Sequence, residues 1–370
     1  MAILNNIRPL LVGARIFGCT PHRLTDRELI ITKFGLVYSL FIAAIIGCIC
    51  IFDFYINVYH TIEFKMRLLI FVRSCLYYIS ILTDGVITMI WNGFLNIIVS
   101  RIYNFDYATK YNQNSNHKMI NACKFIIIIV LAYWTIVGYF TYLCEESDFI
   151  FNAIAYSVVN VTMSMQIMKF IGLLLILYQR FNYLDQMILQ SHFKKGLTVI
   201  VYPERGNMNL QEICWLHYLL VTASEEINSV YSTQLFFWIT ISFLNGLSRI
   251  YTLTTMQAEQ KLYLVIRDSF SVVACALNLF AISAFSHFTA ARANNIRKST
   301  FAPQASMRMK KNFDNFEIMA YFYLKKLHFT AAAGLIRVDL PLLLSVYYWS
   351  HNDVSRYSPC NESIKLKPVI

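Results

Sequence analysis

The stretch Phe34–Phe52 reads FGLVYSLFIAAIIGCICIF and contains nineteen residues without a charged side chain. A second stretch of the same length, Phe125–Leu143, reads FIIIIVLAYWTIVGYFTYL and is also uncharged. A helix needs about 20 apolar residues to cross the roughly 30 Å hydrocarbon core of a bilayer, because each residue advances it by about 1.5 Å. Neither run alternates between apolar and polar residues as barrel strands do. Both therefore predict membrane-spanning helices.

Other apolar runs of similar length carry one or two charges each. Together they predict an all-α fold: a polytopic membrane helical bundle with six transmembrane helices and a short, incomplete seventh. A cytoplasmic segment (1–33) precedes the bundle (34–349), and a polar tail (350–370) follows it. The predicted spans are residues 34–57, 68–98, 125–143, 149–178, 231–253, 262–288 and, incomplete, 336–349.

The composition supports a membrane protein and argues against other classes. Hydrophobic residues make up 57% of the 370 residues and charged residues 14%, against about 45–50% and about 25% in soluble domains. The net charge of +11 does not predict a nucleic-acid partner, because the basic residues lie between apolar runs. The sequence contains no phosphate-binding loop, nucleophile elbow, zinc-protease motif or CxxC pair. We expect no enzyme, no cofactor and no metal site.

The distribution of basic residues predicts the orientation in the plasma membrane. Lys and Arg total 21 on one set of alternate loops and 3 on the other. Positively charged loops stay in the cytoplasm, where anionic lipids attract them. The N-terminus is therefore expected in the cytoplasm, which is the reverse of a G-protein-coupled receptor.

Two cytoplasmic segments have the periodicity of helices. Apolar residues recur at helical spacing within 207–230, which runs without a break into the fifth span, and within 312–326. One interpretation places both segments at the lipid headgroups as surface helices. The other packs them together as a cytoplasmic anchor that joins subunits.

The segment His328–Leu340 reads HFTAAAGLIRVDL and resembles the start of the last helix of insect gustatory receptors. The opening Ile7–Leu10 (IRPL) and Arg15–Gly18 (RIFG) resemble the N-terminus of the same family. Odorant receptors share the architecture, but the His328–Leu340 pattern is the gustatory one. The resemblance implies that the approach to a pore helix is formed by His328, Phe329, Thr330, Gly334 and Asp339.

The resemblance also implies a function and an assembly. Gustatory receptors are seven-helix subunits of ligand-gated, non-selective cation channels that detect small-molecule tastants. Four copies, as a homotetramer or with other gustatory receptor subunits, would place their last helices around a central pore. Segments 207–230 and 312–326 would then form the cytoplasmic anchor.

The sequence departs from the family at its last helix. The family continues for about twenty residues and ends on a Gln-Phe signature, whereas the uncharged stretch Leu340–Trp349 has ten residues and leads into Ser350–Asp353. Ten residues span about 15 Å of helix. A truncated isoform that does not conduct is therefore an alternative function.

Polar and aromatic residues at helical spacing mark the outward ends of several spans. They predict a ligand site between the helices, where aromatic rings and amides can stack on and bond a small molecule. The alternatives are arginines that snorkel to the interface, an aromatic belt, and ordinary hydrogen bonds between helices. The candidate ligand-binding residues are Trp134, Asn152, Tyr156, Asn160, Trp238, Ser242, Asn245, Arg249, Arg267 and Asp268.

A solute transporter is the competing class, since charges within spans also mark transport paths. Transporters favour repeated halves with helices interrupted by glycine or proline. Spans one to six contain no proline, and no internal repeat is visible. The transporter is therefore the weaker hypothesis.

Overall fold

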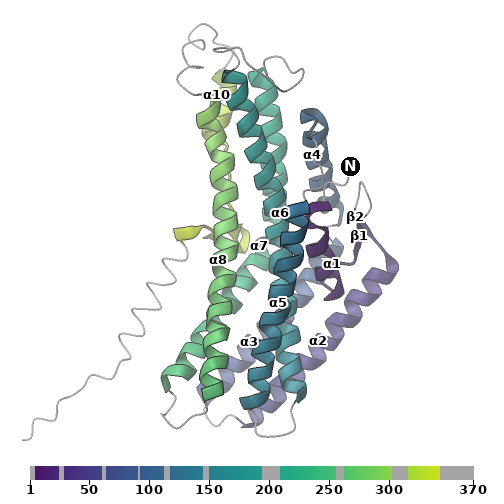
Figure 1. Ribbon diagram of the computed structural model, residues 1–370, viewed down its shortest axis with the longest axis vertical. Helices are drawn as coiled ribbons and strands as arrows, with labels where there is room; N and C mark the ends of the chain where they lie inside the picture. The colour runs from purple at the N-terminus through teal and green to yellow at the C-terminus, as the bar shows by residue number, and fades with distance from the viewer. Residues whose placement is uncertain are drawn as a thin grey trace, which may run out of the picture.

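The computed structural model describes residues 5–24, 29–60, 64–90, 92–111, 117–144, 150–193, 209–255, 262–301 and 316–341. These residues form an elongated bundle of helices with two short strand pairs on its flanks (Figure 1). The all-α fold class is confirmed. The helices are α1 (Arg8–Ile16), α2 (Lys33–His60), α3 (Phe64–Ile90), α4 (Asn92–Thr109), α5 (His117–Cys144), α6 (Ile150–Phe193), α7 (Leu210–Thr255), α8 (Leu262–Thr300) and α10 (Phe316–Leu324).

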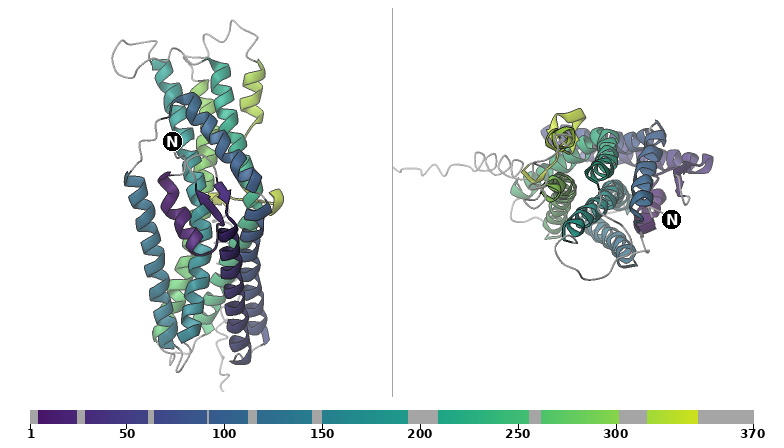
Figure 2. Two further views of the ribbon diagram at one scale, coloured as in Figure 1. Left: turned by 90° about the vertical axis from the view of Figure 1, so that its right-hand side faces the viewer. Right: turned by 90° about the horizontal axis from the view of Figure 1, so that it is seen from above.

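The short strands lie near the middle of the long axis of the molecule. Strand β1 (His22–Leu24) pairs antiparallel with β2 (Leu29–Ile31) beside α1, as the side view in Figure 2 shows. Strand β3 (Thr330–Ala331) pairs with β4 (Ile336–Arg337) against α7. Single 3₁₀ turns occupy Asn5–Ile7 and Ala332–Gly334.

The exposed surface of the helices fits a membrane rather than water. By length and composition, α5, α6 and α8 can cross a bilayer among the described helices. Only 17% of the most apolar part of α5 is buried in the protein, against 83% for α6. Phe125, Ile128 and Tyr139 on α5 are each about 60% exposed, and so wide an apolar surface is stable in lipid but not in water. Helix α6 is accordingly central, and α5 faces the lipid.

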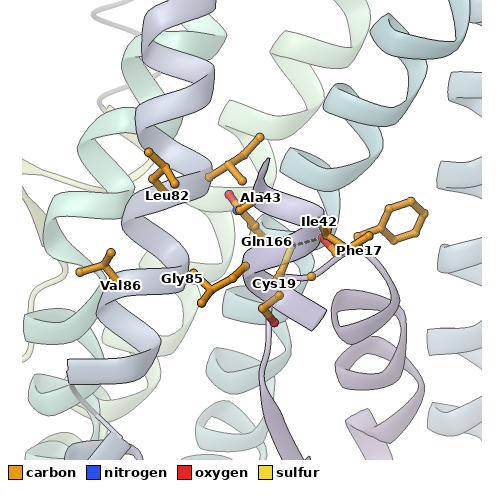
Figure 3. A pocket seen from close by; sticks show the side chains of 12 residues that line it. Phe17, Cys19, Ile42, Ala43, Leu82, Gly85, Val86 and Gln166 are labelled. Atoms are coloured by element: carbon orange, nitrogen blue, oxygen red, sulfur yellow. Dashed lines mark hydrogen bonds between the residues drawn. The ribbon is translucent and has the colours of Figure 1, made fainter. Parts of the chain in front are cut away.

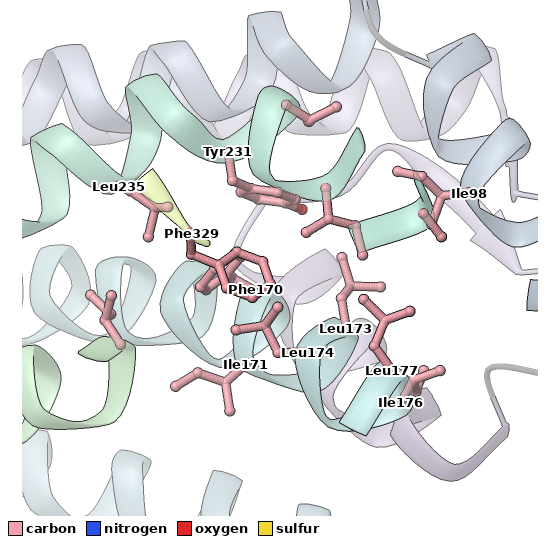
Figure 4. Close-up of a cluster of buried hydrophobic side chains, with 14 of the residues drawn as sticks. Ile98, Phe170, Ile171, Leu173, Leu174, Ile176, Leu177, Tyr231, Leu235 and Phe329 are labelled. Atoms are coloured by element: carbon pink, nitrogen blue, oxygen red, sulfur yellow. The ribbon is translucent and has the colours of Figure 1, made fainter. Parts of the chain in front are cut away.

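The core forms where α6 meets α7. Phe170 is fully buried, and its ring centroid lies 5.3 Å from that of Tyr231. Figure 4 shows Leu174, Leu235 and Phe329 around this pair, so the segment after α10 contributes to the same core. Fully burying one such side chain contributes about 1.5–3 kcal/mol, and the cluster therefore fixes α6, α7 and the chain near Phe329 together.

Three helices are about twice as long as a bilayer crossing requires. Helices α6, α7 and α8 have 44, 46 and 39 residues, or roughly 60–70 Å at 1.5 Å per residue. Their extensions and α4 and α10 form the upper end of the molecule in Figure 1. Helix α7 runs continuously from residue 210 of the predicted anchor 207–230 through the predicted span 231–253, and residues 207 and 208 lie outside the described residues. Helix α10 lies within the predicted anchor 312–326.

The start of the predicted seventh span differs from the expectation. Residues 336 and 337 form a strand, and the helix expected over 336–349 does not begin there. Ala332, Ala333 and Gly334 have φ angles of 52°, 53° and 103°, which reverse the chain so that β4 returns along β3. Residues 342–349 lie outside the described residues.

Candidate ligand-binding site

Tyr77 on α3 joins two of the predicted site residues. Its hydroxyl lies 2.9 Å from the Asn160 Oδ1 of α6, and Asn245 Nδ2 of α7 donates to the same hydroxyl at 3.4 Å. Asn245 also donates to Cys275 of α8 at 3.3 Å, and its Oδ1 accepts from Arg73 at 3.4 Å. One buried polar cluster therefore connects α3, α6, α7 and α8.

A second cluster lies one turn nearer the end of the same helices. Arg249 on α7 and Arg267 on α8 both donate to Asp268 Oδ1, at 2.8 and 2.9 Å. The Arg249 guanidinium lies 5.3 Å from the centre of the Tyr156 ring, a cation–π distance. The Tyr156 hydroxyl in turn bonds Ser271 at 3.0 Å. The arginines are 11% and 15% exposed and Asp268 is fully buried, so an ion pair, rather than snorkelling alone, holds them.

The depth of these residues along their helices is the same. Tyr156 lies six residues after Ile150, Asp268 six after Leu262, and Arg249 six before Thr255. Six residues correspond to about 9 Å of helix. The residues therefore converge at one level of the bundle, near the α7–α8 connection.

Trp134 borders this level from α5. Its ring centroid is 6.2 Å from that of Tyr156 in an edge-to-face arrangement, and its indole N–H donates to Ser164 at 3.0 Å. Trp134 therefore supports Tyr156 rather than lining open space. Asn152, one turn before Tyr156 on α6, is also buried.

Trp238 and Ser242 lie deeper along α7 and outside both clusters. The Trp238 indole N–H donates to Gln166 Oε1 at 3.2 Å, and its ring packs on Phe170 and Tyr231. Ser242 is 2% exposed, and its hydroxyl has no hydrogen-bond partner among the described residues. The predicted residues of α7 therefore have two different surroundings. Trp238 lies in the apolar core, whereas Arg249 lies in the charged cluster.

A small pocket opens beside the first cluster. Its accessible space is about 30 Å³, enough for one or two waters. The lining residues are Ile49, Arg73, Ser74, Tyr77, Ala155, Tyr156, Val159 and Asn160. A larger molecule would therefore need Arg73 or Tyr156 to move.

The electrostatics of the site favour electron-rich groups. Arg249 and Arg267 bring two positive charges to one carboxylate, Asp268. Within the described part of the chain, Arg249 Nε and Asp268 Oδ2 are buried without a hydrogen-bond partner. Buried groups of this kind cost about 1–3 kcal/mol each, and a ligand oxygen can satisfy the guanidinium.

Sequence reasoning missed Tyr77 and Arg73 as site residues. Arg73 is a charge within the predicted span 68–98, and Tyr77 follows it at the i+4 position of the same helix. That spacing places both side chains on one face. This spacing could have indicated that Arg73 and Tyr77 act together, but it does not show which neighbouring helix their face contacts.

The residues predicted before the pore helix lie together on the α7–α8 flank. Phe329 is buried in the core, whereas His328 is exposed. Asn228 of α7 accepts from the Thr330 N–H at 2.8 Å, and Ser232 accepts from the Ala333 N–H at 2.8 Å. Gly334 has the left-handed φ that the turn needs, and Asp339 pairs with Arg337 at 2.7 Å.

Comparison with known proteins identifies the relatives of this architecture. The sequence profile described as 7tm Chemosensory receptor matches residues 7–347. The fold is similar to the insect olfactory receptor OR5 from Machilis hrabei, with a TM-score of 0.68 and 15% identity over 96% of this chain and 98% of that one. For the complex of the same receptor with eugenol the TM-score is 0.64, at 15% identity over 94% and 95%.

No curated protein matches the chain in sequence. The predicted resemblance to insect chemoreceptors is nevertheless confirmed, since the profile covers nearly the whole chain and the fold agrees over nearly all of it. The chain is a multi-pass membrane protein, and its family is one of receptors rather than enzymes. It belongs to the 7tm chemosensory receptor family.

Proposed function

We propose that the chain is a gustatory receptor subunit: a ligand-gated, non-selective cation channel of the plasma membrane that detects a small-molecule tastant. Family membership and the fold shared with OR5 support this proposal, as does the fact that OR5 has been solved with the small molecule eugenol. The observation that carries it is the convergence of Tyr77, Tyr156, Asn245 and Arg249 beside a pocket.

The proposed ligand is neutral or anionic and rich in oxygen acceptors. Arg249 and Arg267 share the single carboxylate of Asp268, so a cationic amine would meet net repulsion. A hydroxyl, carbonyl or carboxylate oxygen can accept from Arg249 or Arg73, while the ring of Tyr156 supplies a stacking face. Sugars, organic acids and oxygenated aromatics share this chemistry.

Helix α7 offers a physical route from the ligand to the pore. It carries Asn245 and Arg249 at the site, and Asn228 and Ser232 where the chain approaches the last helix. A ligand that competes for Arg249 would weaken the ion pair between α7 and α8. A shift of α7 would then act on β3, which bonds directly to it. The proposed assembly is a homotetramer or a heterotetramer with other gustatory receptor subunits, joined by the cytoplasmic ends of α6, α7 and α8.

A non-conducting form is the second candidate function. The observation that favours it is the ten-residue uncharged stretch Leu340–Trp349 followed by polar residues. Such a subunit would bind ligand and assemble without lining the outer half of a pore.

One electrophysiological experiment tests both candidates. The chain is expressed in cells, both as it stands and with a complete family-type last helix grafted after Leu344, and surface levels are matched. Sugars, organic acids, oxygenated aromatics and amines are then applied under voltage clamp. We expect cation current from acceptor-rich compounds in the grafted form. No response in the grafted form would contradict the channel, and current from the unmodified chain would contradict the non-conducting form.

A further inference from the structure

A second pocket lies between the N-terminal segment and helices α2, α3 and α6, away from the ligand site. Its accessible space is about 60 Å³. Figure 3 shows Gln166 of α6 between Leu82 and Gly85 of α3 on one side and Cys19 and Ile42 on the other. Leu40 and Val86 at its rim are about half exposed, so the pocket opens toward the lipid-facing surface.

Two buried polar side chains in this pocket each have one atom without a nitrogen or oxygen partner among the described residues. Ser39 is 4% exposed and Gln166 is 1% exposed, and both line the pocket. Within the described residues, Ser39 Oγ and Gln166 Nε2 have no nitrogen or oxygen partner at hydrogen-bond distance. The single S–H of Cys19 donates to the carbonyl of either Phe17 or Thr162. The Cys19 sulfur also lies within hydrogen-bond reach of the Gln166 amide, but sulfur is only a weak acceptor. Unpaired groups of this kind in an apolar wall mark a place for a polar atom.

The neighbouring charges are already neutralised. Lys169, one turn beyond Gln166 on α6, bonds both carboxylate oxygens of Asp84 at 2.8 and 2.9 Å and the Cys19 carbonyl at 3.1 Å. No net charge remains there to attract a phosphate or ammonium headgroup. Gln166 Nε2 can donate one hydrogen bond, and Ser39 Oγ can donate or accept one. This set matches a single neutral hydroxyl.

We propose that this pocket binds the hydroxyl end of a membrane sterol. A sterol is the abundant membrane lipid whose only polar group is one hydroxyl. The pocket holds that hydroxyl and a few carbons, and the rest of the sterol lies on the apolar rim between α2 and α3. Ser39 follows the start of the predicted first span by five residues, or about 8 Å. The pocket therefore sits close to the cytoplasmic interface in the proposed orientation, at the depth of a sterol hydroxyl.

Occupancy would also act on the core. Gln166 Oε1 accepts from Gln234 Nε2 at 3.3 Å and from the Trp238 indole at 3.2 Å, both on α7. A hydroxyl that accepts from Gln166 Nε2 would fix the orientation of this amide. The bound sterol would thereby stabilise the contact between α6 and α7.

Gly85 offers a matched pair of test variants. A Cβ built on Gly85 would meet no atom within 4 Å, so a side chain there enters the pocket without a clash. Gly85→Leu should fill the space, whereas Gly85→Ala should leave most of it open. Ser39→Ala removes only the hydroxyl and tests recognition without filling.

The test uses the full chain in phosphatidylcholine nanodiscs without sterol. A sterol carrying a diazirine on its rings and a free 3-hydroxyl is photolysed, and labelled peptides are mapped by mass spectrometry. We expect labelling on the peptides around Ser39 and Gly85 and competition by unmodified sterol but not by its 3-methyl ether. Gly85→Leu should reduce labelling roughly tenfold and Gly85→Ala should preserve it, while Ser39→Ala should weaken competition about fivefold.

Several outcomes would overturn the proposal. Labelling that is unchanged in Gly85→Leu, or equal competition by the methyl ether, would show that no hydroxyl site exists. Stronger competition by a monoacylglycerol or a long-chain alcohol would assign the pocket to a single-chain lipid instead. If Gly85→Leu fails to elute as a single species, Ser39→Ala decides: an unchanged ratio between sterol and ether affinities would refute the site.

Discussion

Lys169 of α6 and Asp84 of α3 form an ion pair inside the bundle, with Nζ 2.8 Å from one carboxylate oxygen and 2.9 Å from the other. Their side chains are 3% and 2% exposed. The Cys19 carbonyl accepts a further hydrogen bond from Lys169. The pair thus fastens the N-terminal segment and two helices to one another. Neither charge would be stable alone in an apolar interior.

Breaking this pair should destabilise the protein strongly. Asp84→Ala leaves an unpaired buried ammonium, and we expect a loss of about 3–5 kcal/mol. The double variant Asp84→Leu with Lys169→Met removes both charges and should recover most of the loss. Thermal unfolding of the detergent-solubilised protein measures this. The more exposed pair Arg101–Glu226, at 27% and 17% exposure, is the control, and Arg101→Ala should cost about 1 kcal/mol or less. An equal effect of the two single variants would contradict the prediction.

Tyr77→Phe should change the response to an agonist without changing surface expression. The variant removes the hydroxyl that joins Asn160 and Asn245 but keeps the ring. Loss of such a hydrogen bond corresponds to about 1 kcal/mol, or about fivefold in potency. Dose–response curves of a conducting form measure this. Tyr78→Phe, at the adjacent position on another face of α3, is the control and should match wild type.

Arg249→Ala and Asn245→Ala should also shift agonist potency, and by more than Tyr77→Phe. Arg249 supplies both the ion pair with Asp268 and the contact with Tyr156. Arg249→Ala leaves Asp268 paired with Arg267 alone, so folding should survive. Curves that superimpose on wild type for both variants would remove these residues from the ligand site.

His217 should make the stability of the bundle end formed by α7, α8 and α10 depend on pH. It is 2% exposed, and its Nε2 lies 3.2 Å from the Ala293 carbonyl. A carbonyl only accepts, so Nε2 carries the proton and Nδ1 accepts from the Tyr321 hydroxyl at 3.0 Å. Burial lowers the pKa of His217 from 6.5 to about 4. As the pH falls, His217 therefore binds a proton near pH 6.5 in the unfolded chain but only near pH 4 in the folded protein.

The sign of this linkage predicts that stability falls as pH decreases from about 6.5 to about 4. The expected loss attributable to His217 is about 3 kcal/mol over that range. The measurement is the melting temperature of the purified protein at a series of pH values. His217→Gln should flatten the dependence, and His287→Gln, on α8, should not. Parallel curves for wild type and His217→Gln would refute the assignment.

Asn228→Ala should loosen the segment that precedes the last helix. The side chain of Asn228 pairs with both the N–H and the hydroxyl of Thr330, at 2.8 and 3.1 Å. Truncation leaves the Thr330 N–H without this acceptor, at a cost of about 1–3 kcal/mol. Hydrogen exchange of the Thr330 amide should become faster. Ser229→Ala, at the exposed neighbouring position, should leave exchange unchanged, and equal protection in both variants would contradict the role of Asn228.

An epitope placed before Met1 should be reached by antibody only after the cell membrane is permeabilised. The reason is the asymmetry of 21 basic residues against 3 on alternate loops. Immunofluorescence with and without detergent measures this. A surface protein labelled in the same cells provides the control, and staining of intact cells would reverse the orientation.

Much of the fold followed from the sequence because apolar length is a local property. Runs such as Phe125–Leu143 are long enough to cross a bilayer and contain no charge, so helix is the state that pairs every backbone group there. The periodicity within 207–230 likewise predicted a helix that continues into the next span, and α7 covers residues 210–230 and the whole of 231–253. For the ligand site, spacing alone brought Tyr156 and Asn160 onto one face of α6.

Which faces meet was decided only by the tertiary structure. In a soluble helix the apolar stripe marks the buried side, but lipid and protein interior are both apolar, so a spanning helix such as α6 has no such stripe. The partners of Lys169, Arg249 and Tyr77 therefore could not be read from periodicity. Pairing Asp84 with Lys169 depends on the rotation and depth of two helices whose paired residues are 85 positions apart.

The same reason explains the error at Ile336. The resemblance of His328–Leu340 to the start of a last helix, and the apolar run that follows it, favoured a helix over 336–349. The structure instead places Ala332 and Ala333 at positive φ, because Ser232 binds the Ala333 N–H and Phe329 accepts from the Val338 N–H. Local propensity determined the helices of this protein, whereas long-range hydrogen bonds and buried charges determined where they turn and what they hold.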